Sequence, residues 1–147
     1  MTVIVTGLEC SGTKWMTEML QRHPEIRRAV HTSIPEYLTV EHGFTRWPDL
    51  TGANRVVWVI RYEPFRLKAV ERNRYNAGRA PEFLPPKLYK KAEGLFQSVA
   101  SIAQVVSYEG LVGPFGQLVF RDLLLRMRIR PECPFDPKDA NRKYLAG

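Results

Sequence analysis

The first twenty residues constrain the fold of this chain more than any other stretch. Thr2 to Thr6 is a short run of mostly β-branched residues, which predicts a buried strand. A segment with two glycines follows, Gly7 and Gly12, and the residues from Trp15 to Leu20 then place apolar side chains at helical spacing. A strand, a glycine-bearing loop and a helix N-terminus together predict an anion site. Backbone N–H groups converge there, and the helix dipole adds about half a positive charge.

The polar residues of this loop sharpen the prediction. Ser11, Thr13 and Lys14 add donors to a backbone that glycine allows to curl, so we interpret the segment as a phosphate-binding loop. It departs from the nucleoside-triphosphatase pattern G-x-x-x-x-G-K-[ST]. Thr13 stands between glycine and lysine, and Trp15 stands where a Mg²⁺-binding hydroxyl would follow. An ordinary strand-to-helix turn with a chance glycine pair remains the alternative.

Length and hydropathy favour a single domain over residues 1–147. A chain of 147 residues with 44% hydrophobic content can bury a sizeable core. It has no apolar run of membrane-spanning length, and no basic leader precedes an apolar segment at its start, so we expect neither a membrane helix nor a secretion signal. Cys10 and Cys133 lie far apart and match no metal-ligand spacing, which favours a reduced, cytoplasmic setting.

The net charge of +7 favours an anionic partner, such as a nucleotide, a nucleic acid, or a sulfated or phosphorylated substrate. The basic run from Arg61 to Lys91, with aromatic residues interleaved, would also suit a nucleic acid. We disfavour that reading because no recognised nucleic-acid motif is present. A solvated face, or a grip on nucleotide phosphates, explains the run more simply.

Strands and helices alternate along the chain, which predicts a three-layer, mostly parallel α/β sheet with right-handed crossovers. The predicted strands are Thr2 to Thr6, Arg28 to Thr32, Arg55 to Arg61 and Val105 to Tyr108. The predicted helices are Thr13 to Arg22, one opened by Glu63 and Pro64, Lys87 to Ala103, and Gly116 to Arg128, followed by an irregular tail from Arg130 to Gly147. Ligands of such sheets bind beyond the carboxyl ends of the strands. The segments expected at that edge are Gly7 to Lys14, His31 to Pro35, Arg61 to Pro64 and Tyr108 to Gly110.

Three segments, in this order, resemble the sulfotransferases that use 3′-phosphoadenosine 5′-phosphosulfate. S-G-T-K-W at Ser11 to Trp15, followed by His23 and Pro24, is similar to the family's phosphosulfate loop. V-V-W-V-I-R-Y-E-P at Val56 to Pro64 is similar to its strand that ends in R-D-P. V-S-Y-E-G-L-V at Val106 to Val112, leading into G-Q-L-V-F-R-D-L-L, looks like its R-Y-E-D-L segment and closing helix.

The resemblance implies roles for individual residues. Ser11, Gly12, Thr13 and Lys14 would bind the 5′-phosphosulfate, and Trp15 would pack beside the nucleotide. Arg61 would bind the 3′-phosphate as a charge-assisted donor. This chain departs from the family at three of the remaining donor-binding positions. Cys10 replaces the basic residue before S-G-T, and Lys14 replaces the second threonine. The family's serine is absent at Ala69 and Val70, so Lys68 or Arg72 would bind in its place.

The implied reaction transfers a sulfuryl group to a hydroxyl or amine by positioning and charge neutralisation, with no metal expected. Lys14 would supply the charge, and His31 or Glu36 would act as general base on the acceptor. His31 could instead be a strand-end histidine bonded to backbone, and Glu41 and His42 are weaker candidates for the base. The acceptor, whether small molecule, glycan or protein, is not determined by the sequence. Because the chain is shorter than typical family members, its acceptor pocket would be open or completed by another subunit.

Two other functions remain open. The first is a nucleotide kinase or hydrolase with a phosphate-binding loop, which the position of Lys14 and the presence of Trp15 disfavour. The second is a catalytically degenerate relative that binds a nucleotide or a partner without turnover, which Cys10 and the absent serine favour.

Overall fold

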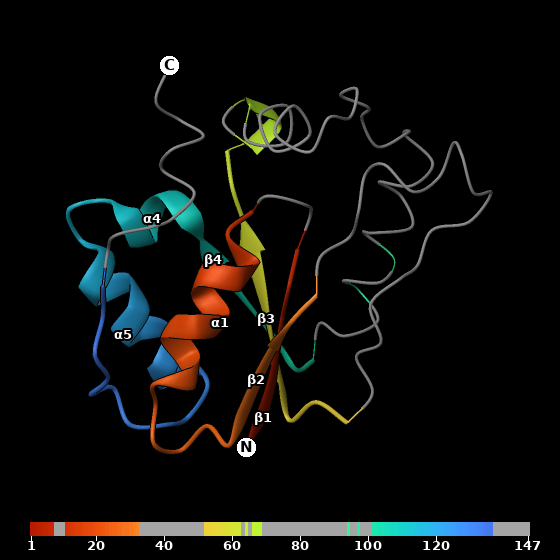
Figure 1. The fold of residues 1–147 in the computed structure, drawn as a ribbon, viewed down its shortest axis with the longest axis vertical. Helices are drawn as coiled ribbons and strands as arrows, with labels where there is room; N and C mark the ends of the chain where they lie inside the picture. The colour runs from red at the N-terminus through yellow and green to blue at the C-terminus, as the bar shows by residue number, and fades with distance from the viewer. Residues whose placement is uncertain are drawn as a thin grey trace.

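The structure is a computed structural model that describes residues 1–7, 11–32, 52–62, 64, 66–68, 94, 97 and 101–136. Strands and helices alternate in this part of the chain (Figure 1). In order they are β1 (Thr2–Thr6), α1 (Thr13–Gln21), β2 (Arg28–His31), β3 (Arg55–Ile60), β4 (Ala103–Ser107), α4 (Tyr108–Val112) and α5 (Gly116–Arg126). None of the helices described is long and apolar enough to cross a membrane.

The described strands form one parallel sheet in the order β2-β1-β3-β4. Strands β1 and β3 are central, and their apolar runs are buried on both faces, as continuous β-branched sequences predict for inner parallel strands. Because all pairs are parallel, the carboxyl ends of the strands meet at one edge. The predicted α/β class is therefore confirmed.

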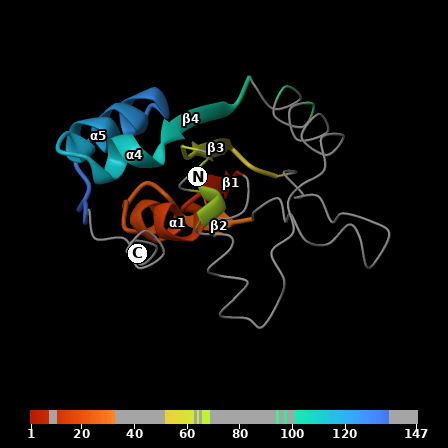
Figure 2. The same ribbon diagram turned by 90° about the horizontal axis from the view of Figure 1, so that it is seen from above.

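Helices α1, α4 and α5 lie on the same side of the sheet (Figure 2). Their apolar faces share one core with alternate residues of the strands. Its members include Val3, Val5, Met16, Leu20, Val57, Val59, Val106, Leu111, Phe120, Leu123, Leu124 and Met127. Two of the three predicted layers are thereby confirmed, and most residues of the helices expected to form the third lie outside the described part.

The sequence predicted strand β1 with its observed bounds, and β2, β3, α1 and α5 with ends one or two residues too long. Two assignments were wrong. Tyr108 begins α4 and does not end a strand, because the Ser107 side chain caps a helix by accepting a hydrogen bond from the Gly110 N–H. Ala103 begins β4 and does not end a helix, since it pairs with Val56 on β3.

Of the predicted helix from Lys87 to Ala103, the structure describes Gly94, Gln97 and residues 101–103. Gly94 and Gln97 are helical, but Ser101 and Ile102 form a turn before β4, so the predicted C-terminal end of this helix is wrong. Pro64 and residues 66–68 are helical too, in agreement with the predicted helix entry. Residues 130–136 contain neither helix nor strand, as predicted for the tail, and residues 137–147 lie outside the described part.

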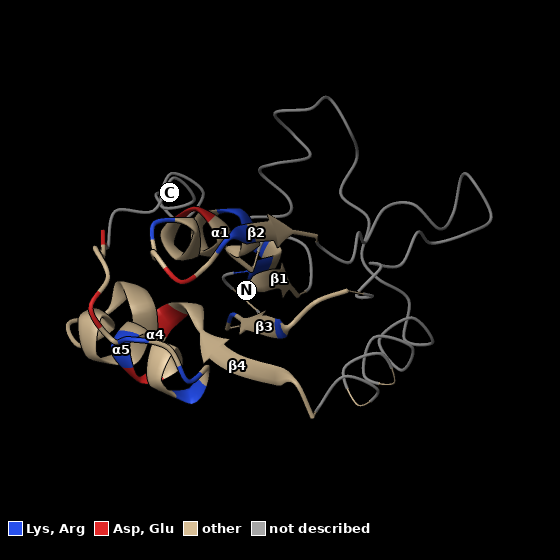
Figure 3. Cartoon of the chain, turned by 90° about the horizontal axis from the view of Figure 1, so that it is seen from below, with Lys and Arg blue, Asp and Glu red and all other residues tan. Residues whose placement is uncertain are grey.

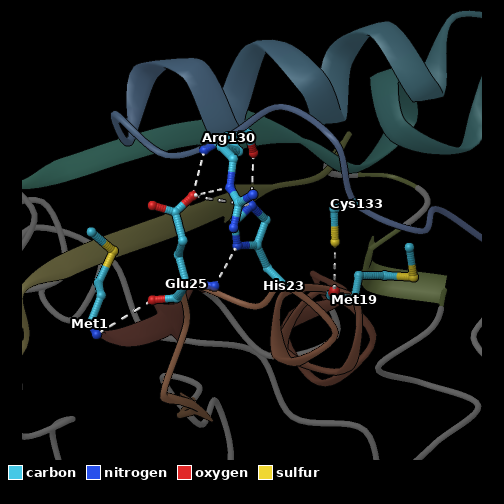
Figure 4. Close-up of polar contacts among 6 residues, drawn as sticks. All are labelled: Met1, Met19, His23, Glu25, Arg130 and Cys133. Carbon is cyan, nitrogen blue, oxygen red and sulfur yellow. Dashed lines mark hydrogen bonds and ion pairs between the residues drawn. The ribbon is translucent and has the colours of Figure 1, made fainter.

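A polar cluster fastens the start of this tail to the end of α1 (Figure 4). The fully buried His23 accepts a hydrogen bond from the Glu25 N–H at Nδ1, 3.0 Å, so its Nε2 donates to the Arg130 carbonyl oxygen, 2.7 Å away. The imidazole of His23 thereby joins the end of α1 to the start of the tail.

Candidate functional site

Loops at the carboxyl edge of the sheet bring the predicted site segments together (Figure 1). Gly7 and residues 11–14 follow β1, Thr32 follows β2, Arg61 and Tyr62 follow β3, and α4 follows β4 directly. The sequence predicted this shared edge correctly, since parallel strands must all end on the same side.

Two glycines allow the loop after β1 to lie close to its neighbours. A Cβ atom on Gly7 would lie 2.6 Å from the Val59 carbonyl oxygen, so any larger residue would push the loop away from β3. Gly12 has φ of 96°, in the left-handed region that favours glycine, and a Cβ there would lie 2.8 Å from Cδ2 of Tyr108. The loop therefore fits against β3 and α4 only with these residues.

Gly12 is also the N-cap of α1, and it has no side chain with which to cap the helix. No acidic residue lies in the first turn, and Lys14 is exposed there. Ser11 and Thr13 are buried beside it. An uncapped helix N-terminus with a lysine in its first turn is a positively charged environment, which suits a bound anion.

The aromatic ring of Tyr108 lies next to both Arg61 and this loop. The Arg61 side chain is 6% exposed, and its Cζ atom lies 4.1 Å from the centroid of the Tyr108 ring. The same ring contacts the Gly12 position, and the buried Trp15 meets it edge-on with centroids 6.1 Å apart at 72°. The ring of Tyr108 therefore connects the predicted 5′-phosphosulfate loop to the predicted 3′-phosphate arginine.

Tyr108 and Glu109 are site residues whose roles the sequence did not reveal. Glu109 accepts a hydrogen bond at Oε1 from the Tyr62 backbone N–H, 2.6 Å, and at Oε2 from the Ser107 hydroxyl, 3.3 Å. The sequence placed Tyr108 to Gly110 at this edge and matched Y-E-G-L-V to a family motif, but it assigned neither residue a contact. Sequence position could have predicted these contacts. Tyr108 and Glu109 directly follow one strand, and Arg61 and Tyr62 directly follow its neighbour in the sheet.

Two further candidates, His31 and Lys68, are described. His31 is exposed at the end of the edge strand β2, where it pairs in register with Val5, and Lys68 is exposed in the helical segment after β3. The fully buried Arg66 lies in that segment as well, and the sequence did not single it out. Cys10, Glu36, Glu41, His42 and Arg72 lie outside the described residues.

Positive charge is not confined to the carboxyl edge. Seen from below, basic residues also lie on α5 and at the amino ends of strands, among them Arg28 and Arg55 (Figure 3). The net charge of the chain therefore does not locate the site, which is defined by the loop, the ring and Arg61. Within the described ranges, no group of three or more His, Cys, Asp or Glu side chains could hold a metal ion.

Comparison of the chain with protein-family models, with curated proteins and with solved structures finds no match.

Proposed function

We propose that this protein is a sulfotransferase that takes its sulfuryl group from 3′-phosphoadenosine 5′-phosphosulfate. One observation carries the proposal: the ring of Tyr108 lies beside both the Arg61 guanidinium and the Gly12 position, where an added Cβ would come within 2.8 Å of it. The donor has an anionic group at each end of its ribose. A site for it needs hydrogen-bond donors at both ends of the sugar, and we assign these two roles to the loop and to Arg61.

The loop end of the site is suited to the phosphosulfate. The first N–H groups of α1 have no intrahelical acceptor, and the N-cap glycine cannot provide one. Lys14 stands in the same turn, where its positive charge is unfavourable to the helix dipole unless an anion lies nearby. The exposure of Lys14 leaves its ammonium group accessible to such a ligand.

The arginine end is suited to the 3′-phosphate. A guanidinium group can donate two parallel hydrogen bonds to a phosphate, and it keeps its charge when it is buried. Burial of Arg61 and its position over Tyr108 limit both its hydration and its rotamers. A preorganised and partly desolvated arginine binds an anion more strongly than a mobile surface arginine does.

The proposed reaction needs few groups. The bond between sulfur and the bridging oxygen of the donor breaks, and a bond forms between sulfur and the acceptor oxygen or nitrogen. The acceptor proton passes to a general base, and 3′,5′-bisphosphoadenosine leaves. Lys14 neutralises the charge that develops on the leaving phosphate, and His31 is the described candidate for the base because it lies at the same edge.

Calorimetric titration with 3′,5′-bisphosphoadenosine, compared with ATP and Mg²⁺, tests this proposal. We expect tight binding of the bisphosphate that EDTA does not weaken. Preference for ATP with Mg²⁺ would refute the proposal and support a kinase or hydrolase. Bisphosphate binding without sulfate transfer to any of a panel of hydroxyl and amine acceptors would instead identify a nucleotide-binding protein without turnover.

A further inference from the structure

We propose that Glu109 is a positioning residue that holds Arg61 in place at the carboxyl edge. Its significance for ligand binding rests on the proposed function, in which Arg61 binds the 3′-phosphate. The positioning itself can be measured in the protein without ligand.

The Glu109 carboxylate bridges the ends of two neighbouring strands. One oxygen accepts the hydrogen bond from the Tyr62 N–H at 2.6 Å, and Tyr62 lies just beyond β3. The other accepts from the Ser107 hydroxyl at 3.3 Å, and Ser107 ends β4. Ser107 in turn accepts from the Gly110 N–H at 3.2 Å, which fixes the first turn of α4. A single side chain thus ties the exit of β3 to the start of α4.

The sheet register explains why this contact acts on Arg61. Ile60 pairs with Ser107 in the parallel β3–β4 ladder. The next residues along the two chains, Arg61 and Tyr108, stack through guanidinium and ring. The residues after these, Tyr62 and Glu109, make the hydrogen bond. Arg61 is therefore held twice by neighbouring residues of α4, once through its side chain and once through the backbone that follows it.

A carboxylate is suited to this role because an ionised acceptor makes a stronger hydrogen bond to a backbone N–H than a neutral one does. Tyr62 is 59% exposed, and its carbonyl oxygen accepts a hydrogen bond from the Arg66 N–H at 3.0 Å, so the carboxylate of Glu109 acts on the N–H side of this residue. Loss of the Glu109 acceptor should free the peptide between Arg61 and Tyr62 and loosen the guanidinium over the ring.

Two variants at Glu109 and one control elsewhere separate positioning from general stability. Glu109→Leu removes the acceptor at similar volume, and Glu109→Gln keeps an acceptor oxygen of the same reach. Asp122→Leu removes an exposed carboxylate from α5, where it pairs with Arg126 at 2.9 Å. NMR of the ligand-free protein follows hydrogen exchange of the Tyr62 amide and the ring-current shift of the Arg61 side-chain N–H over Tyr108.

We expect Glu109→Leu to speed Tyr62 exchange about tenfold, as for the loss of one hydrogen bond to a charged group. The Arg61 resonance should move toward its unstacked position. Glu109→Gln should retain most of the protection, and Asp122→Leu should change neither signal. Unchanged Tyr62 exchange in Glu109→Leu, or equal changes in Asp122→Leu, would overturn the proposal. If Glu109→Leu does not fold, Glu109→Asp replaces it, because it keeps the charge but shortens the side chain that reaches the Tyr62 N–H. Faster Tyr62 exchange together with movement of the Arg61 signal supports the proposal, and unchanged exchange, or faster exchange without movement of Arg61, overturns it.

Binding provides the second readout. The ratio of affinities for 3′,5′-bisphosphoadenosine and adenosine 5′-phosphosulfate, which lacks the 3′-phosphate, should fall about tenfold in Glu109→Leu. Glu109→Gln should restore most of that ratio. A wild-type protein that binds neither ligand would refute the proposed function, while the NMR result would still decide whether Glu109 positions Arg61.

Discussion

The guanidinium of Arg61 lies over the ring of Tyr108, with 4.1 Å between Cζ and the ring centroid. A cation at this distance is attracted to the face of an aromatic ring, by about 0.5–2 kcal/mol depending on its exposure. The contact follows from strand register, since the residues before these two, Ile60 and Ser107, are paired in the sheet. Two residues 47 positions apart, and each next to a strand end, thus form the centre of the site.

Replacement of this arginine should remove 3′-phosphate recognition. We expect Arg61→Gln to weaken binding of 3′,5′-bisphosphoadenosine by about 10- to 100-fold, the loss of one or two charged hydrogen bonds. Binding of adenosine 5′-phosphosulfate should fall much less. Parallel titrations with both ligands measure the difference, and a thermal melt of the variant shows whether it is folded. Equal losses for the two ligands would remove Arg61 from the 3′-phosphate.

The left-handed conformation of Gly12 predicts that an alanine there destabilises the protein, and Gly52, which is also left-handed, provides the control. Gly12→Ala and Gly52→Ala each place a Cβ at positive φ, 96° and 77°, which costs about 1–2 kcal/mol. Only at Gly12 would that atom also meet the ring of Tyr108, because nothing lies within 4 Å of the Gly52 position. Denaturant unfolding should show the larger loss for Gly12→Ala, and only this variant should lose bisphosphate affinity. A Gly52→Ala variant equally impaired in binding would contradict this assignment.

Lys14 is predicted to benefit binding at the expense of stability. Its positive charge lies in the first turn of α1, where the dipole disfavours it, so Lys14→Ala should raise the free energy of unfolding by up to about 1 kcal/mol. The same change should weaken anion binding. Arg27→Ala removes a positive charge from an exposed residue that precedes β2 at the opposite edge, and it should leave binding unaltered. Loss of both stability and affinity in Lys14→Ala would indicate a structural lysine.

The role of His31 as general base predicts an effect on turnover alone. His31→Ala should lower the rate of sulfate transfer about 10²- to 10⁴-fold, the usual contribution of a general base. Donor affinity should change little, because the residue lies on β2, the strand on the far side of β1 from Arg61. Single-turnover transfer with a labelled donor measures the rate. A variant with wild-type turnover would leave Glu36 as the candidate.

The cluster at the end of α1 predicts a pH dependence of stability that involves no ligand. The hydrogen bond from the Arg130 N–H to the Glu25 carboxylate is the main cause that lowers the pKa of Glu25 below its ordinary value of 4.5. The folded state therefore favours the charged form of Glu25. The carboxylate contributes fully to the free energy of unfolding above about pH 4.5, and this contribution is lost as the pH falls through the lower pKa of the folded state. Glu25→Gln should therefore unfold more easily than wild type at pH 6, with a difference that shrinks below pH 4.5.

Urea unfolding at a series of pH values measures this difference. Glu18→Gln, which replaces an exposed carboxyl in the middle of α1, serves as the matched variant. A difference for Glu25→Gln that stays constant down to pH 3, or grows on acidification, would show that the carboxylate does not stabilise the fold.

Local sequence patterns were sufficient to predict the strands, α1, α5 and the parallel α/β class. Burial of both faces in β1 and β3 requires continuous β-branched runs, and burial of one face in α5 requires the spacing of Phe120, Leu123 and Leu124. The short helix α4 was missed because its five residues carry too little periodicity, and its cap depends on the single hydroxyl of Ser107. The hydrogen bond of His23 to the Arg130 carbonyl oxygen was missed because the two residues are 107 positions apart.

The sequence by itself therefore determined which residues follow the strand ends, since strand direction and chain order follow from local patterns. Only the tertiary structure decided which ends are neighbours, because the order β2-β1-β3-β4 and the register of β3 on β4 arise from pairing between segments distant in the chain. The stacking of Arg61 on Tyr108 and the bond from Tyr62 to Glu109 depend on that register. A shift of one residue along β4 would remove both contacts and turn its side chains to the opposite face of the sheet.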